Sequence, residues 1–150
     1  MRWFVYEDQA APQLYPIALL RPAFELVCGR ESLRRRLQRW FPGAEWGACV
    51  RSWLAPAYAE EQPEAIVNDF VALQSSPVLM VNGRWMPAGR LQLQEVSMDN
   101  AGYIDGHLAW IALEQDEAQL LTDDDYAETL LGIARTRRVV EASGTMITRP

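Results

Sequence analysis

The stretch "SPVLMVNGRW", residues 76–85, decides the fold because it is the clearest buried strand of the chain. An apolar run over residues 77–81 leads into Asn82-Gly83, and an Asn-Gly pair favours a tight turn. A continuous apolar strand fits the interior of a sheet that is covered on both faces. We therefore expect residues 76–85 to lie within a sheet, and we interpret the rest of the chain around it.

Strand and helix patterns alternate on both sides of that stretch. The predicted strands are residues 2–7 ("RWFVYE"), 46–51, 65–69, 91–99 and a hairpin over 101–113 that turns at Asp105-Gly106. The predicted helices are residues 32–41, 52–64 with a break at Pro56, and 122–142. Residues 17–26 are expected to be extended, because Pro22 disfavours a helix there. This alternation predicts an α/β fold with a mostly parallel sheet flanked by helices.

Length and charge restrict the function. The chain has 150 residues, which suits one domain, and its net charge is −6, which disfavours nucleic-acid partners. No apolar run reaches the roughly 20 residues of a membrane helix, and the N-terminus carries charges where a secretory signal is apolar. We therefore expect a cytoplasmic protein with no membrane partner. One histidine and two separated cysteines show no zinc-ligand spacing.

Arginine is concentrated in "LRPAFELVCGRESLRRRL", residues 20–37, and the chain contains no lysine. In open α/β sheets, ligands bind at the carboxyl ends of the strands, where we expect this segment to lie. Gly29 precedes a helix start at Ser32, so its surroundings could offer backbone amides to an anion. Arg21 and Arg30 could add charge-assisted hydrogen bonds to a phosphate, and Arg36 could turn toward the same ligand.

The alternative interpretation of these arginines is a basic helix surface with a few ion pairs. On the predicted helix, Leu33, Leu37 and Trp40 share one face. Arg35 and Arg39 lie opposite that face and are expected to be in solvent. Residue types alone do not decide between an anion site and a solvated surface.

The order of several short motifs resembles a known family. The matching residues are Glu7-Asp8, Leu14 with Pro16, Arg21-Pro22, Glu25-Leu26, Gly29, Ser32 and Asn82-Gly83-Arg84. This pattern resembles the N-terminal domain of a group of bacterial sugar nucleotidyltransferases. That group is similar to the bifunctional UDP-N-acetylglucosamine pyrophosphorylase and glucosamine-1-phosphate acetyltransferase. The resemblance extends over nearly the whole chain.

The resemblance implies a Rossmann-like nucleotide-diphospho-sugar transferase fold. Residues 1–150 would be the N-terminal part of the transferase domain, followed by its remainder and by a left-handed β-helix acyltransferase domain. The implied reaction joins a nucleoside triphosphate to a sugar 1-phosphate and releases pyrophosphate, with Mg²⁺ as cofactor. By motif position, Arg21 and Arg30 would contact phosphates as the catalytic pair. The implied nucleotide- and substrate-binding residues are Glu7, Asp8, Gly29, Arg36, Asn82, Gly83 and Arg84.

The chain also departs from the pattern of standard pyrophosphorylases. Residues 7–16, "EDQAAPQLYP", contain no glycine where those enzymes carry a glycine-rich loop. Gly83-Arg84 replaces the Gly-Asp whose carboxylate binds magnesium, and an arginine cannot ligate a cation. A metal would then be held by other oxygens, such as those of Asp8 or of residues beyond 150. These departures favour an alternative, a noncatalytic nucleotide-sugar-binding or scaffolding domain attached to an acyltransferase.

Overall fold

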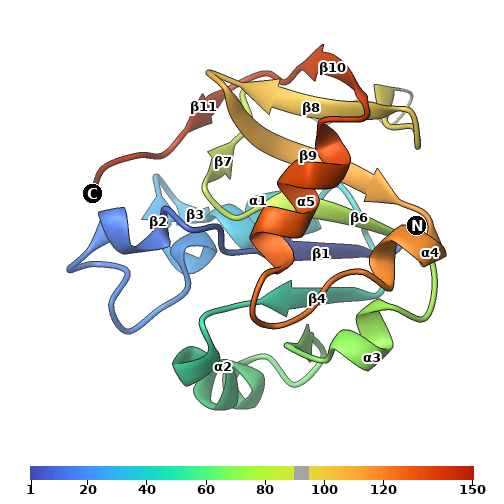
Figure 1. The fold of residues 1–150 in the computed structure, drawn as a ribbon. Helices are drawn as coiled ribbons and strands as arrows, with labels where there is room; N and C mark the ends of the chain where they lie inside the picture. Colours follow the sequence, from blue (N-terminus) through green and yellow to red (C-terminus); the bar gives the residue numbers. More distant parts are fainter. Residues whose placement is uncertain (90–94) are drawn as a thin grey trace.

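A computed structural model describes residues 1–89 and 95–150 (Figure 1). The described residues form a seven-stranded central sheet with the strand order β10-β8-β9-β6-β1-β4-β5. The strands are β1 (Trp3–Tyr6), β4 (Trp46–Cys49), β5 (Ile66–Val67), β6 (Val78–Asn82), β8 (Asn100–Ile104), β9 (His107–Leu113) and β10 (Arg138–Glu141). The helices are α1 (Leu33–Gln38), α2 (Ala55–Glu61), α3 (Phe70–Leu73), α4 (Gln115–Ala118) and α5 (Tyr126–Ala134).

Most neighbouring strands are parallel. β1 pairs in parallel with β4 and β6, β4 with β5, and β8 with β10. Among the described strands of this sheet, only β9 runs against its neighbours, β6 and β8. The prediction of an α/β fold with a mostly parallel sheet is therefore confirmed.

Alternate side chains of β1 enter two different cores. Trp3 and Val5 pack with Leu33 and Leu37 of α1 on one face of the sheet. Phe4 and Tyr6 point the other way and pack with residues of α5. In Figure 1, α5 crosses the front of the sheet and α1 lies behind it. Because both faces are covered, all four residues of β1 are buried, which explains its unbroken apolar sequence.

Smaller elements connect the sheet to its surroundings. A hairpin of β2 (Val27–Cys28) and β3 (Glu31–Ser32) precedes α1, and β7 (Trp85–Met86) pairs with β11 (Thr145–Met146) near the C-terminus. The 3₁₀ turns η1 (Ala11–Leu14), η2 (Ala23–Glu25) and η3 (Ser52–Leu54) lie in the loops. No helix among residues 1–89 and 95–150 is long and apolar enough to cross a membrane.

Several local predictions are confirmed. The side chain of Ser32 caps α1 by accepting a hydrogen bond from the Arg35 amide at 3.3 Å. The predicted hairpin over residues 101–113 forms as β8 and β9, and its turn residues Asp105 and Gly106 have φ values of 50° and 78°. Such left-handed values are what a two-residue hairpin turn requires. The strands predicted at 46–51 and 65–69 form as β4 and β5.

Other local predictions are wrong. The helix predicted over 122–142 ends at Ala134, and Arg138–Glu141 forms β10 instead, because the β-branched pair Val139-Val140 supplies an edge strand that pairs with β8. Residues 17–26 are not extended but form turns and η2. Pro56 does not break the second helix, since it lies in the first turn of α2, where the missing amide proton has no helical partner.

The segments around the opening stretch also differ from expectation. After β6 the chain turns at Gly83-Arg84 and leaves the sheet, so β7 pairs with β11 rather than returning along β6. Residues 91–94 of the strand predicted at 91–99 lie outside the described residues, and residues 95–99 contain no strand.

Candidate functional site

The carboxyl ends of β1, β4 and β6 lie side by side because the three strands are parallel. Glu7 and Asp8 directly follow β1, Arg51 follows β4, and Asn82 is the last residue of β6. In open α/β sheets this is the edge at which ligands bind. We call Glu7, Asp8, Arg51, Asn82 and Arg84 the strand-edge cluster.

Glu7 is fully committed to internal contacts. Its side chain is buried, and its two carboxylate oxygens accept hydrogen bonds from the Ala23 amide at 2.8 Å and the Arg51 amide at 2.9 Å. The Arg51 guanidinium donates to the same carboxylate through Nε at 3.0 Å and Nη2 at 3.1 Å. Glu7, which was expected to bind nucleotide or substrate, therefore holds the loop after β1 and the end of β4 in place.

Arg51 is a residue that the sequence analysis did not select. Besides Glu7, its guanidinium donates to the carbonyl oxygens of Ala18 at 2.5 Å and Arg21 at 2.9 Å, and to the Tyr15 hydroxyl at 3.1 Å. It therefore fastens the loop of residues 15–21 to the edge of the sheet. The available signal was its position two residues after the apolar strand β4, where a charged side chain reaches the strand edge.

Asp8, Asn82 and Arg84 form a second closed network. The Asp8 carboxylate accepts hydrogen bonds from Arg84 Nε at 2.8 Å and Nη2 at 2.6 Å, and from Asn82 Nδ2 at 2.9 Å. Burial alone would raise the pKa of Asp8. The hydrogen bonds from Arg84 and Asn82, together with the charge of Arg84, outweigh that effect and lower the pKa. Asp8 is thus held in its charged form by a fixed guanidinium.

These contacts decide whether the Asp8 carboxylate can act as a ligand of Mg²⁺. Both of its oxygens already accept two hydrogen bonds, since Oδ1 also accepts from the Ala10 amide at 3.1 Å. A cation on this carboxylate would lie against the positive charge of Arg84. Across residues 1–89 and 95–150, no group of three His, Cys, Asp or Glu side chains is arranged to hold a metal. Asp8 as placed does not fit a Mg²⁺ site.

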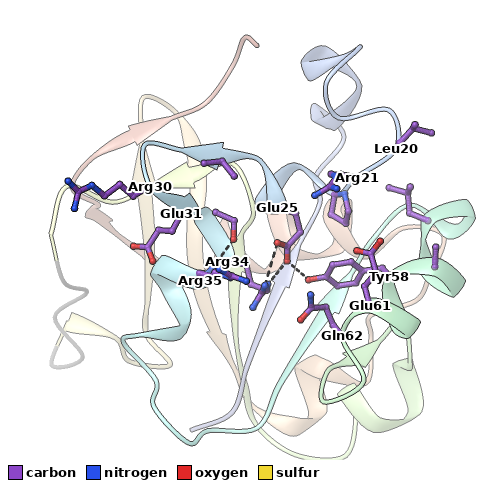
Figure 2. Close-up of a pocket in the computed structure, with 15 residues that line it drawn as sticks. Leu20, Arg21, Glu25, Arg30, Glu31, Arg34, Arg35, Tyr58, Glu61 and Gln62 are labelled. Carbon is purple, nitrogen blue, oxygen red and sulfur yellow. Dashed lines mark hydrogen bonds and ion pairs between the residues drawn. The ribbon is translucent and has the colours of Figure 1, made fainter.

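The expected phosphate contacts lie in a different place. Arg21 and Arg30 both line a cavity of about 290 Å³ bounded by η2, the β2–β3 hairpin, α1 and α2, which we call the arginine pocket (Figure 2). In the part of the chain that the structure describes, neither guanidinium makes a hydrogen bond or an ion pair. Figure 2 shows Arg21 on the same side of the pocket as Tyr58, and Arg30 on the opposite side, beyond Glu31.

A buried network forms the wall of the arginine pocket. Arg34 is 5% exposed, pairs with Glu25, and donates to Gln38 Oε1 at 2.8 Å. The Tyr58 hydroxyl donates to Glu25 Oε1 at 2.7 Å. Since Arg34 and Glu25 neutralise each other, the local charge is set by Arg21, Arg30 and Arg35 against the carboxylate of Glu61, none of which forms an ion pair within the described residues. Arg35 is exposed, as expected, and it also lies at the edge of this pocket, whereas Arg39 is exposed and pairs with Glu31.

Three further expected residues have structural roles. Gly29 does not lie at a helix start but in the β2–β3 turn with φ +84°, and α1 begins later, at Leu33. Arg36 donates to the Cys28 carbonyl at 3.1 Å. Gly83 packs so closely that an added Cβ would lie 2.6 Å from Phe24 Cδ1, so packing against that ring requires a glycine there.

The structure therefore separates Arg21 and Arg30 from Asp8, Asn82 and Arg84, because the two groups line different cavities. Asp8, Asn82 and Arg84 line a second cavity of about 230 Å³, together with the polar side chains of Gln9, Gln13 and His107. We call this the amide-lined cavity. The backbone of Arg21 is connected to the strand-edge cluster through Arg51, but its side chain faces the arginine pocket.

The comparison with known families assigns the chain. The sequence model of the sugar nucleotidyl transferase family matches residues 3–150, which include every strand of the central sheet and both cavities. The chain belongs to the sugar nucleotidyl transferase family. None of the curated proteins compared with the chain matches it.

Proposed function

We propose that the chain is a sugar-1-phosphate nucleotidyltransferase domain with a Rossmann-like nucleotide-diphospho-sugar transferase fold. In the proposed reaction, a phosphate oxygen of the sugar 1-phosphate attacks the α-phosphorus of a nucleoside triphosphate. The bond from that phosphorus to the β-phosphate bridging oxygen breaks, and pyrophosphate leaves. The observation that carries the proposal is the family match over residues 3–150, the whole α/β sheet with its strand-edge cluster.

The arginine pocket supports phosphate binding. Arg21 and Arg30 line it with guanidinium groups that have no partner in the described residues, and guanidinium groups suit the bidentate recognition of phosphate oxygens. In the proposed function these two residues hold phosphate groups of the substrates. Their contribution to the reaction is to orient phosphates and to balance charge as pyrophosphate leaves.

The amide-lined cavity supports binding of the uncharged part of a substrate. The amide side chains of Gln9 and Gln13 present neutral donors and acceptors there, beside Asn82 and the imidazole of His107. Such groups suit the hydroxyls of a sugar or the edge of a nucleobase. We place the sugar or the base in this cavity, which keeps Asn82 beside the ligand as the family resemblance implies, whereas Gly83 packs against Phe24 and does not line the cavity.

A second candidate function is binding without transfer, as a nucleotide-sugar-binding or scaffolding domain attached to an acyltransferase. Two observations favour it: the Asp8 carboxylate is hydrogen-bonded to Arg84 and Asn82, and the chain contains no lysine. No catalytic step through Mg²⁺ is assigned, because Asp8 does not fit the ion. In either candidate, a transferase remainder and a β-helix domain following residue 150 are part of the proposal.

Calorimetry and a pyrophosphate-release assay distinguish the candidates. UTP, dTTP and their sugar adducts are titrated into the protein, and pyrophosphate is then measured in the presence of each sugar 1-phosphate. Binding with pyrophosphate release supports the transferase, and binding without release supports the second candidate. A folded protein that binds none of these ligands contradicts both.

A further inference from the structure

The carboxylate of Asp8, which follows β1, is already surrounded by hydrogen-bond donors, two of which belong to a positively charged side chain. Asp8 Oδ1 accepts from Arg84 Nε at 2.8 Å and from the Ala10 amide at 3.1 Å. Asp8 Oδ2 accepts from Arg84 Nη2 at 2.6 Å and from Asn82 Nδ2 at 2.9 Å. The two guanidinium nitrogens therefore meet both carboxylate oxygens, the fork-to-fork geometry of a strong arginine–carboxylate pair.

Arg84 is fixed in this position from several sides. It is 1% exposed, and its Nη1 donates to the Ile147 carbonyl oxygen at 2.8 Å. Its backbone amide donates to Asn82 Oδ1 at 2.9 Å, and its backbone carbonyl accepts from the Ile147 amide at 2.8 Å. The guanidinium cannot leave Asp8 without also breaking its hydrogen bond to Ile147.

The Asp8–Arg84 pair lies between two cavities. Asp8 and Arg84 line the amide-lined cavity, and Asp8 also lines a cavity of about 310 Å³ that contains residues 123–125, three consecutive aspartates. A divalent ion that approached Asp8 from either side would meet a carboxylate whose hydrogen-bonding positions are taken and whose charge is balanced. Replacing a guanidinium by a hydrated cation there would leave Arg84 buried and unpaired, which is costly.

We propose that Arg84 is the built-in cation of the strand-edge site: it occupies the position of a divalent ion at Asp8, and this carboxylate binds none. The inference deepens the proposed function, because it states which group supplies the positive charge at the strand-edge cluster. It rests on the proposed function only for the expectation that the ligand bound there is a nucleotide or a sugar phosphate. It predicts that the charge at the end of β1 is set by the polypeptide and does not depend on the metal concentration.

Paramagnetic broadening by Mn²⁺ tests the proposal without any nucleotide. Amide resonances of the ¹⁵N-labelled protein are followed while MnCl₂ is added. We expect the signals of Gln9 and Ala10 to be broadened no more than those of residues 123–125, because these aspartates line the same cavity as Gln9 and an ion bound there also broadens its neighbours. Selective loss of the Gln9 and Ala10 signals at low Mn²⁺ concentration would overturn the proposal.

The variant Arg84→Gln tests the role of the guanidinium directly. Removing the positive charge exposes the Asp8 carboxylate, so Mn²⁺ should now broaden Gln9 and Ala10 selectively. The control Arg135→Gln removes an exposed positive charge at the end of α5 and should leave these signals as in the wild type. A folded Arg84→Gln protein without new broadening would show that Arg84 does not stand in for an ion.

The wild-type experiment remains decisive if Arg84→Gln does not fold. It also separates this inference from the proposed function, because it contains neither a nucleotide nor a sugar phosphate. Whether Mn²⁺ binds at Asp8 can therefore be measured even if the protein binds no nucleotide.

Discussion

The guanidinium of Arg51 meets the carboxylate of Glu7 at two points, with Nε 3.0 Å from Oε2 and Nη2 3.1 Å from Oε1. Glu7 follows β1 and Arg51 follows β4, so the pair joins the ends of two neighbouring parallel strands. Burial by itself lowers the pKa of Arg51, but hydrogen bonds and charge from Glu7 outweigh this and raise it. In this ion pair the Glu7 side chain is buried and the Arg51 side chain is partly exposed.

Glu7→Ala is expected to lower the free energy of unfolding by about 3–5 kcal/mol, because Arg51 is left without its buried counter-charge. The measurement is urea denaturation followed by tryptophan fluorescence. The matched control is Glu31→Ala, which removes the partner of the exposed Arg39 and should cost less than about 1 kcal/mol. Equal losses in the two variants would mean that the Glu7–Arg51 pair has no special structural role.

The Asp8–Arg84 pair predicts how stability depends on pH. The folded-state pKa of Asp8 lies below its value in the unfolded chain, so the unfolded state takes up a proton first as the pH falls. The contribution of Asp8 is complete above the unfolded pKa of about 3.9 and is lost as the pH falls through the lower folded pKa. An NMR titration of the Asp8 carboxyl carbon should give a midpoint below that of a model peptide.

The same titration in Arg84→Gln should move the Asp8 midpoint upward, because the guanidinium that lowers it is gone. Unfolding curves of this variant should show a smaller loss of stability between pH 5 and pH 2, as estimated from the linkage between pKa and stability. An unchanged Asp8 midpoint in the variant would contradict the assignment of the shift to Arg84.

Gly83→Ala should destabilise the protein by about 1–3 kcal/mol, the usual cost of overpacking a core. The new Cβ would lie 2.6 Å from Phe24 Cδ1 and 3.0 Å from the Tyr6 carbonyl oxygen. Gly132→Ala is the control, because it lies in α5 with nothing within 4 Å of the added atom. That change should stabilise the protein by about 0.5–1 kcal/mol, since alanine favours the helix interior. Thermal unfolding of the two variants should shift in opposite directions.

Arg21→Ala should weaken nucleotide binding by about 1.5–3 kcal/mol, the range for hydrogen bonds to charged groups. The physical reason is the loss of an unpaired guanidinium at the arginine pocket. Calorimetric titration gives the affinity, and Arg135→Ala removes the same charge from an exposed site at the end of α5. A matching affinity in both variants would place the phosphates outside the arginine pocket.

Local patterns predicted the elements that one short segment specifies by itself. The apolar runs of β1 and β6 predicted buried strands, Ser32 predicted the start of α1, and Asp105-Gly106 predicted the β8–β9 turn. These features depend on neighbours in the sequence, so residue types reveal them. The last helix was overextended because the pairing of Val139 and Val140 with β8 is a long-range contact.

The candidate site was only partly predictable for the same reason. The order of motifs led to Arg21 and Arg30, which do line one pocket, but Glu7 and Arg84 were expected to face a ligand and instead form buried pairs. Each of those pairs joins residues that are far apart in the chain. Arg51 was missed because its role depends wholly on contacts with residues 7–21.

The sequence by itself determined that the chain alternates strands and helices around a covered parallel sheet, because hydrophobic periodicity and turn residues act over a few positions. Only the tertiary structure decided which charged side chains are unpaired in the described residues and which form ion pairs with one another. That distinction depends on which strand ends the fold brings together. A charged side chain forms an ion pair only when the fold places its partner within hydrogen-bond distance. Glu7 and Asp8 are adjacent in the sequence, yet the fold pairs one with Arg51 and the other with Arg84.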